Sequence, residues 1–240
     1  MNRQDYKNTI GLQVESLFDL VQFQVNRCFD VEKLCAMMSR EEYAGLKRII
    51  LTGCGDSYSA AGTMAPMVAR YSGLPVGVPD PMEFTRFYTE EEALAGFSGD
   101  EVLVVAISAS SGAARIVEIL EHARELGARS MLITNNPQSR GAQAARYVYN
   151  AETPDLCNTP GLRSYFASMV ALAALGYGLG RLRAYRRDME AAMDDIFRQN
   201  DKTAGSIIAS IGIPALLFDA EGRILWKNQA FAEIFKGADI

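Results

Sequence analysis

The sequence has few of the residues from which metal centres and nucleophilic triads are built. It contains one histidine, His122, and four cysteines that form no Cys-x-x-Cys pair: Cys28, Cys35, Cys54 and Cys157. Structural zinc takes clusters of cysteine and histidine ligands, and a Ser-His-Asp triad needs a histidine inside its site. We therefore expect no metal centre of this kind, and no triad unless His122 lies in the site. Because the cysteines show no disulfide framework, they predict a cytoplasmic protein.

An excess of positive charge is also lacking. Lys and Arg number 24 against 29 Asp and Glu, which gives a net charge of −5. A protein that neutralises many phosphates needs a basic face, so this composition disfavours nucleic acid as a partner. Residues 1–46 hold five basic and seven acidic side chains, which also disfavours a DNA-reading segment there.

Long hydrophobic runs are almost absent. The first 17 residues contain no continuous apolar segment, so we expect no signal peptide. Residues 165–180 are apolar and rich in Ala and Gly, but this length is short for a membrane span. The segment predicts a buried helix that packs closely through small residues, and we expect no membrane partner.

Apolar residues make up 49% of the 240, enough for one substantial core. The pattern alternates between short apolar runs and amphipathic segments, which is typical of a doubly wound α/β fold with a parallel sheet and flanking helices. The predicted strands are 47–52, 76–78, 102–107, 131–134 and 147–149. The predicted helices are 5–27, 31–38, 58–72, 89–95, 113–126, 142–146 and 163–183. The predicted divisions are N-terminal helices (1–44), the α/β domain (45–187), a charged linker (188–205) and a C-terminal segment (206–240).

Two of these strands end in loops of small residues that open a helix. The first loop is Gly53-Cys54-Gly55-Asp56-Ser57, and the second is Ser108-Ala109-Ser110-Ser111-Gly112. Both loops lie at the carboxyl edge of a parallel sheet, where helix N-termini present free N–H groups to an anion. Hydroxyl donors and missing β-carbons suit a phosphate monoester. Neither loop is GxGxxG or GxxxxGK[ST], so we expect no dinucleotide or other cofactor and no nucleoside-triphosphate hydrolysis.

Taken together, these loops resemble the SIS (sugar isomerase) domain family, which includes the isomerase half of glucosamine-6-phosphate synthase. The matching segments are 53–58, 82–88, 106–112, 132–135 and 180–183, so the likeness covers residues 45–183. It implies a flavodoxin-like sheet, a homodimer and a phosphosugar site. The implied phosphosugar-binding residues are Gly53, Gly55, Asp56, Ser57, Ser108, Ala109, Ser110, Ser111 and Gly112.

The chain departs from that synthase at the second loop and at the catalytic residues. The synthase has Ser-Gln-Ser-Gly-Glu-Thr there, so Ala109 replaces the Gln, and Gly112 and Ala113 replace the Glu-Thr pair. Ser111 is the one residue that could restore a donor. The catalytic histidine of the synthase has no counterpart, since His122 falls in the following helix, where we expect it to face solvent. Counting back from residue 180, Arg163 takes the position of the synthase's lysine.

Aldose–ketose isomerisation needs a base between C1 and C2, an acid for ring opening and a cation near the enediolate. Leu156 falls on the position of the synthase's glutamate, and a shift of one residue puts Asp155 there. The candidate bases are Glu83, Glu152 and Asp155, with Arg163 or Arg86 as the electrostatic partner. We expect a sugar-phosphate isomerase or an amino-sugar-phosphate isomerase or deglycase. The alternative is a sensor that binds a sugar phosphate without turnover; a sugar-sensing transcription regulator is disfavoured by charge. The sugar itself stays open.

The C-terminal segment reads as a β-hairpin, 214–219 and 223–227, followed by a helix at 228–235. It resembles the opening of a PAS domain over residues 213–235. Because only the first two strands and first helix match, we expect no haem or flavin. An isolated hairpin is marginally stable, so its apolar side chains need a covering surface from this chain or from a second subunit.

Overall fold

The computed structural model describes residues 9–29, 31–151, 153–154 and 162–182, together with strands at 216–218 and 224–227. The chain divides into two compact units, Met1–Tyr185 and Arg186–Ile240. The first unit contains a five-stranded parallel sheet, and the second contains a two-stranded antiparallel hairpin. The finer limits of the predicted segments stay predictions.

The parallel sheet has the strand order β2-β1-β3-β4-β5, as a doubly wound fold requires. Its strands are β1 (Arg48–Gly53), β2 (Val76–Gly77), β3 (Val102–Ile107), β4 (Arg129–Thr134) and β5 (Tyr147–Asn150). Central strand β3 pairs with β1 and with β4, and all six of its residues are buried. A strand covered on both faces needs this continuous apolar sequence. The predicted α/β fold class is therefore confirmed.

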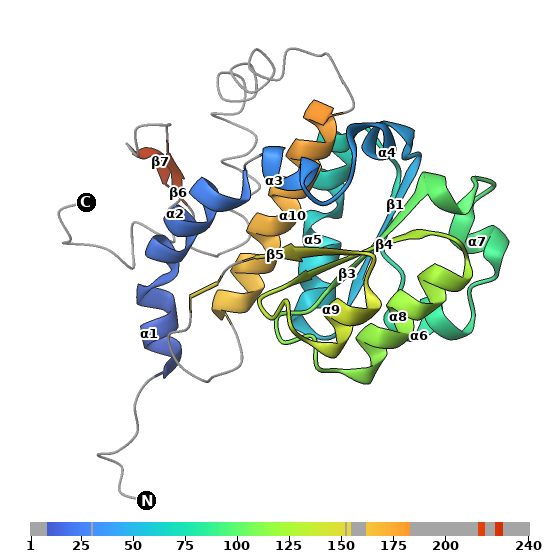
Figure 1. The fold of residues 1–240 in the computed structure, drawn as a ribbon. Helices are drawn as coiled ribbons and strands as arrows, with labels where there is room; N and C mark the ends of the chain where they lie inside the picture. Colours follow the sequence, from blue (N-terminus) through green and yellow to red (C-terminus); the bar gives the residue numbers. More distant parts are fainter. Residues whose placement is uncertain are drawn as a thin grey trace, which may run out of the picture. The chain divides into compact units, whose positions relative to one another are not determined.

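Helices cover both faces of the sheet (Figure 1). The described helices are α1 (Thr9–Glu15), α2 (Leu17–Cys28), α3 (Val31–Cys35), α4 (Arg40–Gly45), α5 (Asp56–Ser72), α6 (Pro81–Arg86), α7 (Glu90–Leu94), α8 (Ala114–Glu125), α9 (Arg140–Ala144) and α10 (Leu162–Leu182), with the 3-10 helix η2 at Gly99–Glu101. Alternate residues of β3 enter two separate cores. Leu103 and Val105 join the core under α5 and α10, whereas Val104 and Ala106 join the core under α6, α8 and α9.

Helix α10 is a core helix, as its small residues predict. It packs along α5 and also contacts α2. It is long and apolar enough to cross a membrane, but 61% of its apolar window is buried inside the protein. A soluble core helix passes the same test of length and composition, so α10 is weak evidence for a membrane span.

The N-terminal helices differ from the single amphipathic helix predicted over 5–27. The described part is divided into α1 and α2 at Ser16, and α2 lies against α10. Several apolar residues that the predicted helix places in the core are exposed, including Ile10 and Val25. Gln24, in contrast, is buried, and its side-chain amide donates to the carbonyl oxygen of Ala151. The apolar periodicity was right for helix but did not identify the buried face.

Two short helices, α4 and α6, were not predicted from the sequence, and both begin with a capping box. Ser39 caps α4, where its hydroxyl accepts from the Glu42 amide and Glu42 accepts from the Ser39 amide. Asp80 caps α6 in the same way, with Pro81 at the first helical position. These motifs are readable in the sequence, but helices of this length leave too little periodicity to find.

In the second unit, β6 (Leu216–Phe218) and β7 (Ile224–Lys227) pair antiparallel, which confirms the predicted hairpin. The predicted helix at 228–235 and the likeness to a PAS domain lie outside the described residues.

Candidate functional site

The two small-residue loops lie side by side at the carboxyl edge of the sheet. Gly53 ends β1 and pairs in register with Ile107, which ends β3. A β-carbon at Gly53 would lie 2.7 Å from the Ile107 carbonyl oxygen and 2.9 Å from the Ser57 β-carbon. Only glycine fits this approach. The next turn also needs glycine, because Gly55, the N-cap of α5, has a φ of 58° and a ψ of −126°.

The second loop is held from inside by Ser111, whose φ of 51° lies in the left-handed region. Its hydroxyl is buried, 2.8 Å from the Ser108 carbonyl oxygen and 2.6 Å from Thr134 Oγ1. Its amide donates to Ser108 Oγ at 3.0 Å. The side chain of Ser111 is thus engaged within the loop and with β4, whereas Ser110 is exposed. The donor that Ser111 was expected to restore is already in use.

A pocket of about 310 Å³ opens beside the first loop. Its lining residues come from that loop, from α5, from the start of α6 and from α8: Gly53, Cys54, Gly55, Tyr58, Asp80, Pro81, Met82 and Arg115. Of the predicted binding residues only Gly53 and Gly55 line it. Asp56, Ser57 and the five residues of the second loop lie at the same sheet edge but not in the lining.

Helix α6 reaches the pocket because β1 holds the segment before it. The Thr52 hydroxyl, which is buried, donates to the Pro79 carbonyl oxygen at 3.0 Å. Asp80 follows, and its Oδ1 accepts from the amides of Met82 and Glu83 at 2.8 and 3.4 Å. The Glu83 carboxylate in turn accepts from the Asp80 amide at 3.4 Å. Glu83, a candidate base, therefore serves as the second half of a helix cap.

Arg163, the candidate electrostatic partner, faces the N-terminal helices. Its Nη1 donates to Ser16 Oγ at 2.6 Å and to the Ser16 carbonyl oxygen at 3.2 Å, and its Nη2 donates to the Pro154 carbonyl oxygen at 3.0 Å. Its amide donates to Gln13, whose side chain is buried. Arg163 thus joins the start of α10 to the junction of α1 and α2. The remaining candidate bases, Glu152 and Asp155, lie outside the described residues. Arg86, the alternative electrostatic partner, donates to Glu118 Oε2 at 3.2 Å and does not line the pocket.

Six lining residues of the pocket were not among the predicted site residues. Two, Pro81 and Met82, are apolar, and the other four carry polar or ionisable groups: Cys54, Tyr58, Asp80 and Arg115. Burial raises the pKa of the Cys54 thiol; the positive charge of Arg115 opposes this shift, and the negative charge of Asp80 adds to it. The signal for Asp80 was its position before Pro81 as a helix cap. For Arg115 the signal was a cation in the first turn of a helix that follows a phosphate-type loop.

His122 does not face solvent as expected. Its side chain is 20% exposed, and its ring meets the Phe84 ring edge-on at 5.1 Å between centroids. It lies in the third turn of α8, and it is not among the residues that line the pocket. Within the described residues, no group of three or more His, Cys, Asp or Glu side chains could hold a metal ion.

The parallel sheet with paired glycine and serine loops at its carboxyl edge is an α/β domain of the doubly wound class, and sequence comparison identifies its family. The SIS domain model matches residues 42–176, and the chain belongs to the SIS domain family. The isomerizing glutamine–fructose-6-phosphate aminotransferase of Tropheryma whipplei is 26% identical over 148 residues, 61% of this chain and 23% of that protein. The same enzyme of Symbiobacterium thermophilum is 28% identical over 145 residues, 60% of this chain and 22% of that protein. The chain spans less than a quarter of these relatives.

Solved structures share the fold. The C-terminal domain of glucosamine-fructose-6-phosphate aminotransferase from Francisella tularensis has a TM-score of 0.65 at 18% identity, covering 88% of this chain and 60% of that one. An Escherichia coli CFT073 protein in complex with a sugar phosphate has a TM-score of 0.57 at 19% identity, over 78% and 96%. The sugar isomerase domain of an RpiR transcription factor from Sphaerobacter thermophilus has 0.52 at 19%, over 82% and 99%.

Proposed function

We propose that this chain binds a sugar phosphate at the carboxyl edge of its sheet, between the loops at 53–57 and 108–112. The observation that carries this proposal is the contact of Gly53 with Ile107, which brings two anion-binding types of loop together beside a pocket. Support also comes from the E. coli protein of the same fold that was solved in complex with a sugar phosphate. The proposed setting is the cytoplasm, where thiols such as the free Cys28, Cys35 and Cys54 stay reduced.

The proposed reaction is aldose–ketose isomerisation of that sugar phosphate, or the isomerase or deglycase reaction of an amino-sugar phosphate. Within the described residues, Glu83 is part of a helix cap, so we assign the base to Glu152 or Asp155. The residues beside Glu152 are tied to the sheet edge: the Ala151 amide donates to the Thr134 carbonyl oxygen at 2.8 Å, and Thr153 donates to Asn135 Oδ1 at 2.8 Å. A carboxylate there acts as a base near neutral pH if burial raises its pKa.

The second candidate is a sensor that binds a sugar phosphate without converting it. One observation favours it: the described members of the predicted catalytic set make structural bonds, Glu83 to Asp80, Arg163 to Ser16 and Arg86 to Glu118. The SIS-type fold also occurs in the RpiR transcription factor of Sphaerobacter thermophilus.

The test combines thermal unfolding with a panel of hexose, pentose and amino-sugar phosphates and NMR detection of proton exchange at C1 and C2. A ligand that binds the native state raises the melting temperature. An isomerase also exchanges the sugar proton with solvent, and Glu152→Gln or Asp155→Asn then slows exchange by at least about a hundredfold. Glu83→Gln is the control and leaves exchange within about threefold. Stabilisation without exchange establishes the sensor, and no stabilisation by any sugar phosphate refutes the proposal.

A further inference from the structure

Among the described residues that line the pocket, Arg115 is the one with a cationic side chain. It stands in the first turn of α8, and its side chain is fixed from two sides. Its Nη1 donates to Thr85 Oγ1 of α6 at 3.3 Å and to Glu118 Oε2, one turn further along α8. Its Nε and Nη2 form no hydrogen bond with any described residue. The guanidinium therefore has a defined position and still has donors left for a ligand.

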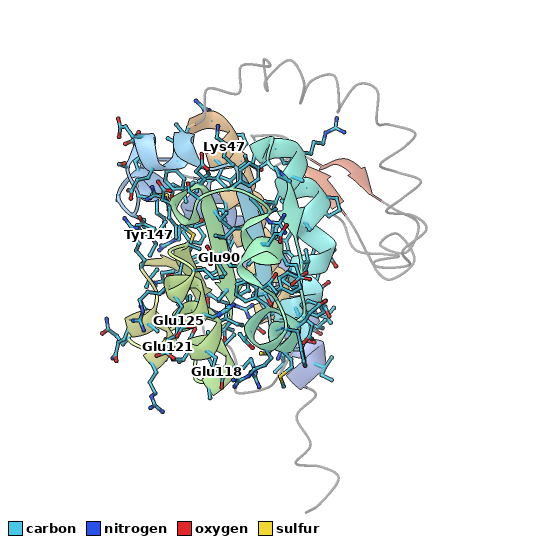
Figure 2. The ribbon with its side chains drawn as sticks, turned by 90° about the vertical axis from the view of Figure 1, so that its right-hand side faces the viewer. Lys47, Glu90, Glu118, Glu121, Glu125 and Tyr147 are labelled. Carbon is cyan, nitrogen blue, oxygen red and sulfur yellow. The ribbon has the colours of Figure 1, made fainter. Side chains whose placement is uncertain are left out.

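Glu118 is not paired with Arg115 alone. Its Oε2 also accepts from Arg86 Nη2 at 3.2 Å, so two guanidinium groups share one carboxylate. These three side chains carry one net positive charge, and the Asp80 carboxylate lines the same pocket. In Figure 2, Glu118 lies at the end of the first unit opposite Lys47, which directly precedes β1. The cluster thus belongs to the carboxyl end of the sheet, where the two loops lie.

The first turn of a helix is an unfavourable place for a cation, because the N-terminal end of the helix dipole is positive. Helix α8 has no acidic residue in its first turn, and Ala113 provides no side-chain cap. Nothing in α8 itself offsets the charge of Arg115 except Glu118, which Arg86 shares. An anion held by Arg115 would relieve this repulsion, and the pocket gives it room.

The second loop offers few side-chain donors, because Ala109 and Gly112 have none and the Ser111 hydroxyl is bonded within the loop. Ser108 and Ser110 keep their hydroxyl groups, but neither residue lines the pocket. Opposite chemistry is present on the α6 side of the pocket, where the Asp80 carboxylate can accept hydrogen bonds from hydroxyl groups. The pocket thus presents a cation for a phosphoryl group and a carboxylate for sugar hydroxyls.

We propose that Arg115 is the residue that binds the phosphoryl group of the ligand, with its free Nε and Nη2 donors. This inference rests on the proposed function, since it assigns a role within the same site. A guanidinium fits a phosphate through two parallel charge-assisted hydrogen bonds, which a lysine cannot reproduce. Arg115 is therefore a binding residue that compensates for the sparse second loop.

The experiment is calorimetric titration of the full chain with inorganic phosphate, fructose 6-phosphate and fructose, for the wild type, R115Q, R115K and R86Q. We expect R115Q to weaken binding of both phosphate-bearing ligands at least about tenfold, and R115K to weaken it less. R86Q removes the same charge from the same Glu118 but outside the pocket lining, so we expect it to weaken binding less than R115Q does. Thermal unfolding without ligand shows which variants are folded; if R115Q is not, R115K carries the comparison.

The outcomes separate this inference from the proposed function. Equal affinity of the wild type, R115Q and R115K for fructose 6-phosphate overturns the role of Arg115 but leaves sugar-phosphate binding intact. An equal loss of affinity in R115Q and R86Q also overturns it, because the loss then reflects the general positive field of the two arginines and not direct contact with Arg115. If inorganic phosphate binds through Arg115 while fructose 6-phosphate binds no more tightly, the Arg115 site stands and hexose-phosphate recognition fails. If no phosphate-bearing ligand binds the wild type, both are refuted.

Discussion

Gly53 sets the distance between the two loops, because its missing side chain lets β1 and β3 end in contact. We predict that Gly53→Ala lowers the free energy of unfolding by about 1–3 kcal/mol, since the new β-carbon meets the Ile107 carbonyl oxygen at 2.7 Å. The same change is expected to abolish stabilisation by any sugar phosphate that protects the wild type. Urea unfolding and thermal shift measure the two effects.

The matched control is Gly62→Ala. Gly62 lies inside α5, is exposed, and has no atom within 4 Å of an added β-carbon. Alanine is the better helix former by about 1 kcal/mol, so this variant should be slightly more stable than the wild type. Unchanged stability and ligand response in Gly53→Ala would show that the two loops tolerate a wider separation.

At the scale of elements, Arg163 joins α10 to the junction of α1 and α2 with three hydrogen bonds from its guanidinium. We predict that Arg163→Lys lowers the free energy of unfolding by about 2 kcal/mol, because an ammonium cannot span Ser16 and Pro154 together. Arg124→Lys on the exposed side of α8 is the control, with a change below about 0.5 kcal/mol. If Arg163→Lys keeps full stability but loses turnover, Arg163 acts in catalysis instead.

Helix α4 is bound to the sheet through Glu42. Its Oε1 accepts from Tyr147 at 2.8 Å, from Arg146 at 2.9 Å and from Arg129. Partial burial alone would raise the pKa of this carboxyl group, but the Ser39 amide, Tyr147 and the two arginines outweigh it and hold the pKa below 4.5. Because the pKa is lower in the folded state, Glu42 stabilises the protein above pH 4.5 and loses this effect as the pH falls through the folded-state pKa.

Glu42→Gln therefore lowers the free energy of unfolding at pH 7 by about 1.5–3 kcal/mol, the usual contribution of hydrogen bonds to a charged group. We expect the difference from the wild type to shrink below pH 4.5, which urea unfolding between pH 7 and pH 3 measures. Glu41→Gln, in the same turn and exposed, is the control. A difference that does not depend on pH would contradict the argument.

For the molecule as a whole, hydrophobic pattern and turn residues were enough to predict the sheet. The apolar run at 102–107 predicted strand β3 with both of its ends correct. Thr89 and Glu92 correctly predicted the capped start of α7. The pocket was not predictable, because it depends on Thr52 drawing Asp80 to the first loop and on Arg115 reaching Thr85. These are contacts between distant segments, and no local sequence pattern encodes them. Which side of α1 is buried also depends on contacts with distant segments, so the local pattern did not predict that its apolar side chains are exposed.

The described residues carry most of their exposed large apolar side chains between residues 10 and 29: Ile10, Leu12, Val14, Phe18, Val25 and Phe29. The inward contacts of the same helices are partly polar, since Gln13 and Gln24 are buried. Such a surface favours association. The SIS resemblance implies a homodimer, so we propose that a second copy of this chain covers this surface.

Ile10 and Val14, 59% and 38% exposed, lie one turn apart on α1 and allow a direct test of that dimer. Each apolar side chain buried at an interface contributes about 1.5–3 kcal/mol, so the double variant Ile10→Glu/Val14→Glu should raise the dimer dissociation constant by at least about two orders of magnitude. Sedimentation velocity across a concentration series measures it. Phe87→Glu, at a 73% exposed residue after α6, should leave the dimer intact. A wild type that sediments as a monomer, or a double variant that remains dimeric, would contradict the proposal that a second copy of this chain covers this surface.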